Sequence, residues 1–340
     1  MTTILDLTPP NAAARIATWL AEHDEAPFRI NQIVPRLWQR PVRMWSDATD
    51  LPADLRGRLA DAFPLPILEL LRREDSADGT VKFLWRVGGT ASVESVWIPG
   101  RRRRTLCISS QEGCAYGCGF CATGTMGFLR HLTPSEIAGQ VREMRFLEEE
   151  FPPPTNIVFM GMGEPLHNWK SVDPTLTILN DPTGLGIGAR NITVSTIGLV
   201  PGLKQLAARP EQFGVAWSLH AAVSSRRAAL MPIEAKYPLA KVQQAMKAFS
   251  RRVTLEYVMI EGANDGDEDA RALAAIAMDL RAHVNLLPLH PGGTEGLRPS
   301  RPAQIAAFAK VLRSERVNVT VRTSRGLDIN AACGQLRTAG

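Results

Sequence analysis

The chain has 340 residues, of which 45% are hydrophobic and 21% charged, a globular composition that allows a buried core. The first twenty residues lack the order of a secretion signal, and the most apolar stretch is too short to span a bilayer. We therefore expect a cytoplasmic protein without membrane contact. The net charge of +5 permits a polyanionic partner without requiring one. Five cysteines, three of them clustered, favour metal or catalytic use over a disulfide framework.

The first part of the chain is predicted to be helical. Short helices broken by proline and polar turns are expected at 13–23, 30–38, 51–63 and 64–74. Two strands follow, "VKFLWRV" and "SVESVWIP". These patterns predict a helical accessory domain at 1–79 and a β extension or linker at 80–104. The basic run Arg101–Arg104 is interpreted as a solvated turn, slightly in preference to a contact with RNA phosphates.

An alternation of strands and helices occupies the remainder, residues 105–340. Apolar strands are expected at 105–110, 156–161, 191–198, 214–221, 253–260 and 284–290, with a final strand at 317–324. Helices are expected at 132–150 and after residues 169, 201, 239, 268 and 302. Such alternation predicts an α/β fold with a parallel sheet. Six units are too few for a closed eight-stranded barrel, so we expect an open, partial (βα)6 barrel in preference to a doubly wound sheet.

Polar residues gather at the ends of the predicted strands. They are the cysteine loop after the first strand, "GMGEP" with Glu164 after the second, Ser195 and Thr196, Ser218 and His220, and His290. Because chemistry in such folds collects at the carboxyl ends of the strands, these residues predict one site at the mouth of the barrel.

The three clustered cysteines are Cys114, Cys118 and Cys121, in the stretch "GCAYGCGFC". A structural zinc site normally takes four Cys or His ligands, and the local supply stops at three. A [4Fe–4S] cluster with three thiolate ligands instead leaves one iron open for a substrate or cofactor. The spacing therefore favours a cluster, and a zinc knuckle is the alternative.

The spacing CxxxCxxC after the first strand resembles that of the radical S-adenosylmethionine (SAM) superfamily. A closer resemblance, to the RlmN/Cfr family of RNA adenine methyltransferases, covers about Glu94 to Leu336 and rests on a series of motifs. They are "TLCISSQEGCAYGCGFCATGTMGFLRHLTPSEI", "GMGEPLHN", "STIGLVPGL", "SLHAA", "LEYVMIEGANDG" and "RTSRGLDINAACGQLR". It extends more loosely over the N-terminal helices and implies an accessory domain of RNA-binding type. It also implies a [4Fe–4S] cluster and SAM as cofactors.

The resemblance implies roles for the residues outside the cluster. Cys333 matches the cysteine that becomes S-methylated, Cys107 the one that resolves a covalent protein–RNA intermediate, and Glu94 the proton acceptor. The SAM contacts carried over are Gly163, Glu164, Ser195, Ser218, Leu219 and His220. From the residues alone, the preferred interpretation of Cys107 is a small buried strand residue, and that of Cys333 is a loop thiol without function. Glu94 shares a strand face with Val96 and Ile98, which predicts partial burial and a raised pKa, with a surface acid as the alternative.

One position departs from the family pattern. The family commonly has Asn before Pro at the end of the sixth strand, whereas "LPLHPGG" places His290 there. Neutral His, like Asn, offers one donor and one acceptor in a bulkier ring, so the SAM contact is expected to persist.

The resemblance favours methylation of carbon 2 of an adenine in 23S rRNA, with tRNA as a further substrate. Carbon 8, the Cfr-type reaction, is the alternative within the family. A non-catalytic zinc or iron–sulfur RNA-binding module is the alternative from another class, and the pair Cys107 and Cys333 argues against it. An electron donor such as flavodoxin is implied as a partner, and we expect a monomer.

Overall fold

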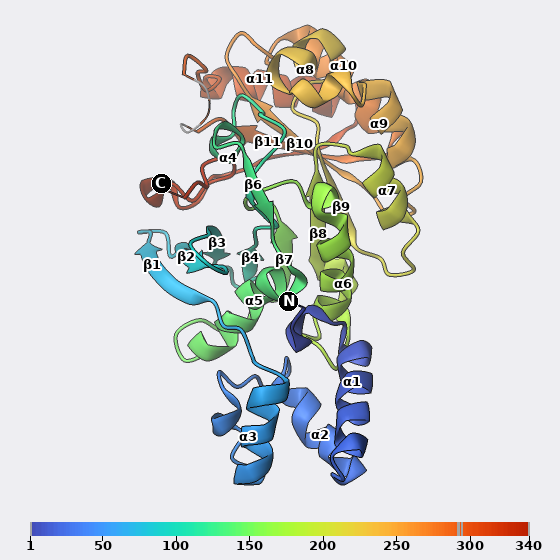
Figure 1. Ribbon diagram of the computed structural model, residues 1–340. Helices are drawn as coiled ribbons and strands as arrows, with labels where there is room; N and C mark the ends of the chain where they lie inside the picture. Colours follow the sequence, from blue (N-terminus) through green and yellow to red (C-terminus); the bar gives the residue numbers. More distant parts are fainter. Residues whose placement is uncertain (1, 291–292, 294, 339–340) are drawn as a thin grey trace.

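The computed structural model describes residues 2–290, 293 and 295–338. One ten-stranded sheet, in the order β1-β2-β3-β4-β7-β8-β9-β10-β11-β12, forms its centre (Figure 1). The parallel strands are β4 (Thr105–Cys107), β7 (Asn156–Phe159), β8 (Ile192–Thr196), β9 (Gly214–Ser218), β10 (Thr254–Met259), β11 (His283–Pro288) and β12 (Asn318–Val321). β1 and β12 are the two sheet edges, so the barrel is open, as the sequence predicts.

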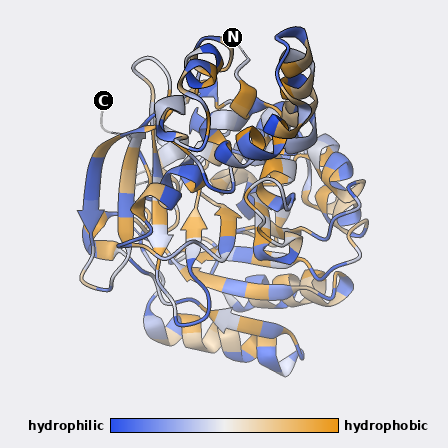
Figure 2. Ribbon diagram, turned by 90° about the horizontal axis from the view of Figure 1, so that it is seen from below, coloured by the Kyte–Doolittle hydropathy of each residue, from blue (hydrophilic) through white to orange (hydrophobic). Residues whose placement is uncertain are grey.

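Helices alternate with the parallel strands and pack around them. They are α5 (Pro134–Glu143), α6 (Trp169–Asn180), α7 (Val200–Ala207), α9 (Leu239–Met246), α10 (Asp267–Asp279) and α11 (Pro302–Ser314). The six predicted strand–helix units are therefore confirmed. The strands at the centre are mostly hydrophobic in Figure 2, because helices or other strands cover both of their faces. None of the helices in the described part of the chain is long and apolar enough to cross a membrane.

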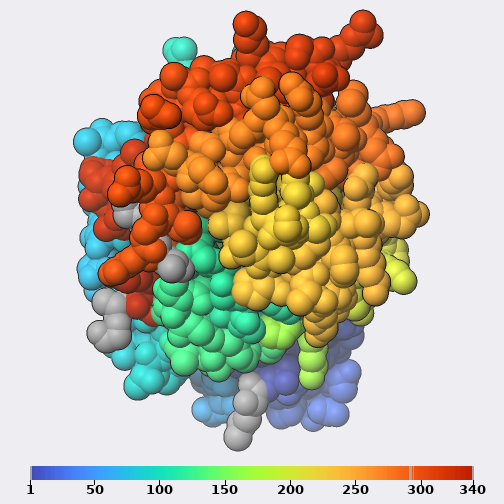
Figure 3. Space-filling view, turned by 90° about the horizontal axis from the view of Figure 1, so that it is seen from above, coloured from blue at the N-terminus to red at the C-terminus, as the bar shows by residue number. Residues whose placement is uncertain are grey.

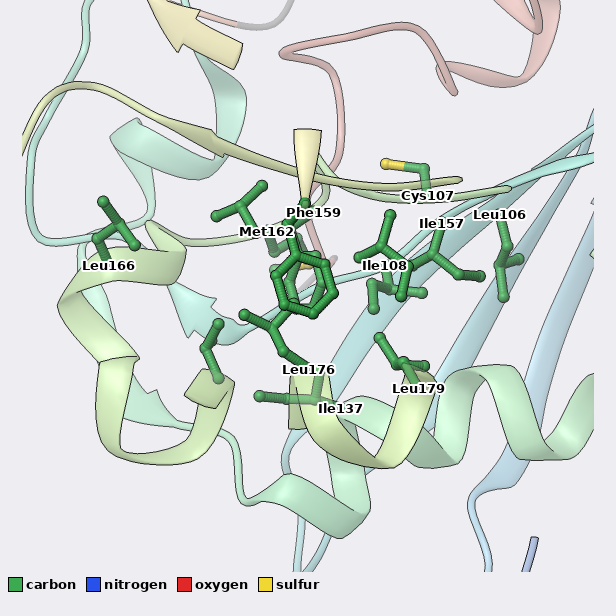
Figure 4. Packing of buried hydrophobic residues seen from close by; sticks show 14 of the residues in the cluster. Leu106, Cys107, Ile108, Ile137, Ile157, Phe159, Met162, Leu166, Leu176 and Leu179 are labelled. Carbon is green, nitrogen blue, oxygen red and sulfur yellow. The ribbon is translucent and has the colours of Figure 1, made fainter. Parts of the chain in front are cut away.

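The core beneath β4 and β7 shows how the strands sort their side chains (Figure 4). Leu106 and Ile108 point toward the α5 and α6 side, where Ile137 and Leu176 lie. Cys107, between them, points to the opposite face, as alternation along a strand requires. That opposite face is the interior of the barrel.

Three antiparallel strands extend the sheet beyond β4: β3 (Ser92–Ile98), β2 (Val81–Arg86) and β1 (Glu69–Asp75). The helix expected at 64–74 is wrong. Pro64 and Pro66 disfavour a helix, and residues 69–75 pair with β2 instead. Leu70 and Leu71, which suggested a helix, are partly exposed on this edge strand.

The N-terminal segment carries α1 (Pro9–Glu22), α2 (Ile30–Ile33) and α3 (Ala53–Ala62), which form a separate group at the bottom of Figure 1.

Four elements of the barrel were not predicted from the sequence: β5 (Gln111–Gly113) and β6 (Phe128–His131), which form a small hairpin, and the helices α4 (Ala122–Thr125) and α8 (Ser224–Leu230). The hairpin brackets the cysteine loop.

Candidate active site

A cavity of about 150 Å³ lies at the carboxyl ends of the parallel strands. Most of the residues expected at the site line it: Cys114, Cys118, Cys121, Gly163, Glu164, Ser195, Ser218, His220, His290 and Cys333. Leu219 is buried between two of them, and Cys107 and Glu94 are buried and do not line the cavity. The structure therefore brings together residues that are more than 200 positions apart in the sequence.

The cysteine loop is closed by its own backbone. Cys114 N–H donates to the carbonyl of Gly127 at 2.8 Å, and Cys121 N–H donates to that of Cys118 at 3.1 Å. Gly119 N–H donates to the carbonyl of Leu230 at 3.0 Å, which fixes the loop against the end of α8. In Figure 3 the green segment around residue 120 is packed between yellow residues near 230 and the orange and red C-terminal segments.

The three thiols suit a cluster better than a single metal ion. In the described residues, no three His, Cys, Asp or Glu side chains are arranged to hold one metal ion. A cubane cluster makes no such demand, because each thiolate binds its own iron. Burial raises the pKa of all three thiols, that of Cys114 to about 12. Such thiols need nearby cations to ionise, and the irons of a cluster would supply them.

Glu164 is a buried carboxylate at the cavity wall. Oε1 accepts from the backbone N–H of Leu166 at 3.0 Å, and Oε2 accepts from that of Ile197 at 2.9 Å. Burial nevertheless raises the pKa of Glu164 to about 7. A ligand ammonium placed beside it would restore the ionised form, which makes Glu164 a suitable partner for the amino group of SAM.

Gly163 allows the chain to approach Gln111 closely. Its φ of +97° is in the region that favours glycine, and a Cβ there would lie 2.5 Å from Cβ of Gln111. The Gln111 side chain accepts from Glu164 N–H through Oε1 at 2.7 Å, and its Nε2 lies 3.0 Å from Nδ1 of both His131 and His167. Gln111 thus connects the hairpin to the Glu164 loop.

His220 has a fixed tautomer and an unusual backbone. Its φ is +53°, and its ring packs edge-on against Phe120 with centroids 4.5 Å apart. Val258 N–H donates to Nδ1 at 3.1 Å, so the proton of the neutral ring is on Nε2. Burial lowers the pKa of His220 to about 3, which keeps the ring neutral. Beside it, the hydroxyls of Ser195 and Ser218 are hydrogen-bonded at 3.1 Å. Together these groups offer a ligand both donors and acceptors.

His290 occupies the position where the family commonly has Asn. It lines the cavity, and its Nε2 is hydrogen-bonded to the hydroxyl of Ser324. Burial lowers the pKa of His290 below its usual range. The ring therefore connects the end of β11 to the start of the C-terminal tail, residues 322–338.

The tail places Cys333 at the cavity. Ala122 N–H donates to the carbonyl of Gly334 at 2.7 Å, and the Thr123 hydroxyl donates to that of Leu336 at 2.5 Å. The tail is therefore held by residues that directly follow Cys121. Cys333 is exposed toward the cavity, and desolvation, with a smaller contribution from Glu256, raises its pKa to about 11.

Cys107 and Glu94 share the inner face of the sheet. Cys107 is paired across the sheet with Val96, two residues from Glu94. Burial raises the pKa of Cys107 well above its usual range, and the charge of nearby Cys333 raises it further. The structure thus holds both sulfurs as free thiols in one neighbourhood.

Glu94 is more deeply buried than the partial burial predicted from its strand, with 1% of its side chain exposed. One oxygen accepts from Arg337 N–H at 3.0 Å, and the other lies 3.2 Å from Nζ of Lys82. Burial raises the pKa of Glu94, as predicted, although the Lys82 ammonium opposes the rise. Lys82, Ser324 and Gln111 were not identified from the sequence, because single polar residues carry no signal apart from their distant partners.

Comparisons with known proteins identify the family of the chain. Residues 108–274 match the model of the Radical SAM superfamily. The chain is 57% identical to the probable dual-specificity RNA methyltransferase RlmN of Gemmatimonas aurantiaca, over 98% of this chain and 93% of that relative. It is 43% identical to the dual-specificity RNA methyltransferase RlmN of Anaeromyxobacter dehalogenans, over 96% and 90%.

A solved structure extends the similarity to three dimensions. The crystal structure of a radical SAM methyltransferase from Sphaerobacter thermophilus superposes with a TM-score of 0.93 at 40% identity, covering 99% of each chain. This similarity includes the helical N-terminal segment, the antiparallel extension and the open barrel. The chain therefore belongs to the radical SAM superfamily and, within it, to the RlmN family of dual-specificity RNA methyltransferases, whose cofactors are a [4Fe–4S] cluster and SAM.

Proposed function

We propose that this protein methylates carbon 2 of an adenine in 23S rRNA, and in tRNA, through a methyl group carried on Cys333. The observation that carries the proposal is the position of Cys333, on the same cavity wall as the three cluster cysteines. A second thiol, Cys107, lies close behind it. Membership of the RlmN family supports the choice of RNA and of carbon 2.

Two sets of residues are proposed to bind the two cofactors. Cys114, Cys118 and Cys121 would hold the cluster, and Glu164, the Ser195–Ser218 pair and His220 would hold SAM. The bound cofactors supply a 5′-deoxyadenosyl radical by one-electron reduction, and the electron comes from a donor such as flavodoxin.

The thiols and Glu94 then carry the methyl group to the RNA. Cys333 takes a methyl group from one SAM molecule by displacement, for which its thiol must first ionise. After hydrogen abstraction the methylene on the Cys333 sulfur adds to the adenine carbon, which joins RNA to protein. Glu94 accepts the proton from that carbon. One electron remains on the adduct after this proton has left, and it passes to the cluster that the three cysteines would hold. Cys107, as a thiolate, then bonds to the Cys333 sulfur as the carbon–sulfur bond breaks, and the released carbon takes up a proton to become the methyl group. The resulting disulfide is reduced by an external thiol before the next cycle.

The helical segment and the β extension are proposed to help bind RNA. We assign the helical accessory domain to residues 1–79, the β extension to 80–104 and the barrel to 105–340, except that β1 (Glu69–Asp75) is counted with the extension. The side chains of Arg101, Arg102 and Arg103, at the end of this extension, are exposed and available for phosphate contacts.

Mass spectrometry of nucleosides tests the proposed function. Anaerobically reconstituted protein is incubated with SAM, a reductant and either a 23S rRNA fragment or tRNA, and the RNA is digested. We expect 2-methyladenosine from both RNAs and none with the Cys333→Ala variant. Formation of 8-methyladenosine would show that carbon 8 is methylated and not carbon 2. RNA left unmodified by an iron-loaded protein would overturn the proposal.

A further inference from the structure

A buried lysine joins Glu94 to the protein surface. Nζ of Lys82 lies 3.2 Å from Oε1 of Glu94 and 2.8 Å from Oε2 of Glu74. Exposure rises along this row, from 1% of the Glu94 side chain to 8% for Lys82 and 28% for Glu74. The three side chains therefore form a continuous polar path from the inner face of the sheet to its solvent-accessible edge.

The strand register places these three side chains next to one another on one face of the sheet. Glu74 on β1 is directly opposite Lys82 on β2, and Glu94 on β3 is opposite Leu84, the next residue on the same face as Lys82. Lys82 is itself opposite Val96, which is opposite Cys107 on β4. Burying a lysine is costly unless its charge is compensated, and two carboxylates compensate this one.

Glu94, the base of the proposed reaction, must release the proton that it takes up. Each cycle delivers one proton to Glu94, and the carboxylate must lose that proton before it can act again. Because Glu94 is almost fully buried, water has little direct access to it. The backbone N–H of Arg337 occupies its other oxygen at 3.0 Å, so the Lys82 side is the one that leads outward.

We propose that Lys82 and Glu74 form the exit route for the proton that Glu94 removes from adenine, an inference that rests on the proposed function. Lys82 Nζ gives a proton to Glu74 and takes the proton held by Glu94. The ammonium is regenerated, the Glu94 carboxylate is restored, and Glu74 becomes the acid. The net charge of the three groups is the same before and after, and Glu74 then releases the proton to water.

The charges around the route are compatible with this direction. Arg72 Nε lies 2.9 Å from the other oxygen of Glu74, so a second cation faces Glu74 at the outer end of the route. The ammonium of Lys82 opposes protonation of Glu94 from the other side. Glu94, Lys82, Glu74 and Arg72 are thus a row of alternating charge, with its outer end at the sheet edge.

The test measures how fast the protein releases RNA after the covalent adduct has formed. The adduct is collected as a slow, ribonuclease-sensitive gel band, and its formation and decay are timed separately in the first turnover and in the turnovers that follow. We expect Lys82→Met and Glu74→Gln to form the adduct at the parent rate and to release RNA about a hundredfold more slowly over repeated cycles, a typical size for lost proton transfer. A purely structural role would slow formation and decay together.

Two further variants separate proton transfer from simple charge. Lys82→Arg keeps a positive charge beside Glu94, but a guanidinium does not give up a proton, so release should stay slow. Recovery of the parent rate in Lys82→Arg would overturn the route in favour of charge alone. Glu69→Gln is the matched control, because Glu69 is on the same strand, is 62% exposed and pairs with Arg86 instead. It should release RNA at the parent rate.

The outcomes distinguish the route from the function on which it rests. Glu74 is partly exposed and its replacement leaves the Lys82–Glu94 pair in place, so Glu74→Gln decides even if the Lys82 variants fail to fold. Release at the parent rate by Glu74→Gln, with normal methylation by the parent, would overturn the route alone. A parent protein that methylates no RNA, or a Glu94→Gln variant that releases RNA normally, would overturn the assignment of Glu94 and the route together.

Discussion

The backbone N–H of Ala122 donates a hydrogen bond to the carbonyl of Gly334 at 2.7 Å. Ala122 directly follows Cys121, and Gly334 directly follows Cys333. One short contact therefore sets the position of the thiol proposed to carry the methyl group relative to the loop proposed to hold the cluster. This backbone contact, together with the hydrogen bond from the Thr123 hydroxyl to the Leu336 carbonyl, holds the tail against the cysteine loop.

Replacing Ala122 by proline removes this hydrogen bond. Ala122 is the first residue of α4, where proline is tolerated, and Cys121 already has the extended conformation that a following proline requires. We expect normal iron content but about fivefold faster alkylation of Cys333 in cofactor-free protein, as suits the loss of one hydrogen bond of about 1 kcal/mol. Thr125→Ala, which removes only a bond to the Ala122 carbonyl, is the control. Unchanged alkylation of Ala122→Pro would show that other contacts hold the tail.

Replacing Cys333 or Cys107 by alanine should block the reaction at two different steps. Cys333→Ala should still cleave SAM slowly while transferring no methyl group. Cys107→Ala should stall after addition and accumulate a protein–RNA adduct, seen as a slow band sensitive to ribonuclease. Both variants should keep the parent's iron content, because neither residue belongs to the CxxxCxxC motif. Normal turnover by Cys107→Ala would remove that thiol from the mechanism.

His290 can be tested by equilibrium binding of SAM. His290→Asn should keep the affinity within about tenfold, or roughly 1.4 kcal/mol, because both side chains offer a donor and an acceptor. His290→Ala should lose more, since a polar group would be left unpaired. Ser324→Ala removes the partner of His290 without changing the ring itself. Equal binding by the parent and both His290 variants would mean that His290 does not contact SAM.

Glu164 should make the stability of the cofactor-free protein depend on pH. Burial raises its pKa to about 7 from an ordinary value of 4.5, so the folded state binds the proton more tightly than the unfolded state does. The free energy of unfolding should therefore fall as pH rises from about 4.5 to about 7, by roughly 3 kcal/mol at most. Denaturant titrations of the parent and Glu164→Gln give this contribution as their difference. A difference that is constant over this range would contradict the assignment.

Local patterns in the sequence predict the barrel and much of its site. The apolar strands, the capping of α5 by Thr133 and the spacing of the three cysteines are all encoded within short stretches. Their positions at strand ends suffice to predict a shared mouth, because parallel strands share a direction.

The parts of the fold and site that the sequence did not predict depend on residues far apart in the chain. The segment 64–74 contains leucines with no clear strand period, and only pairing with β2 makes part of it a strand. Lys82 looks like an ordinary strand residue until Glu74 and Glu94 are placed on either side of it. Glu94 and Arg337 are 243 positions apart, and no local pattern reports such a contact.

The fastening of the tail also has a consequence for the order of assembly. Asp328 accepts from Ser76 Oγ at 2.6 Å and from Ala77 N–H at 3.1 Å, and Asp78 accepts from Gly326 N–H at 3.1 Å. Each of these contacts joins residues about 250 positions apart, so none can form until nearly the whole chain has left the ribosome. The reactive thiol of Cys333 is thus the last functional group to arrive, and nascent chains should remain chemically inert toward RNA while the barrel is already taking shape.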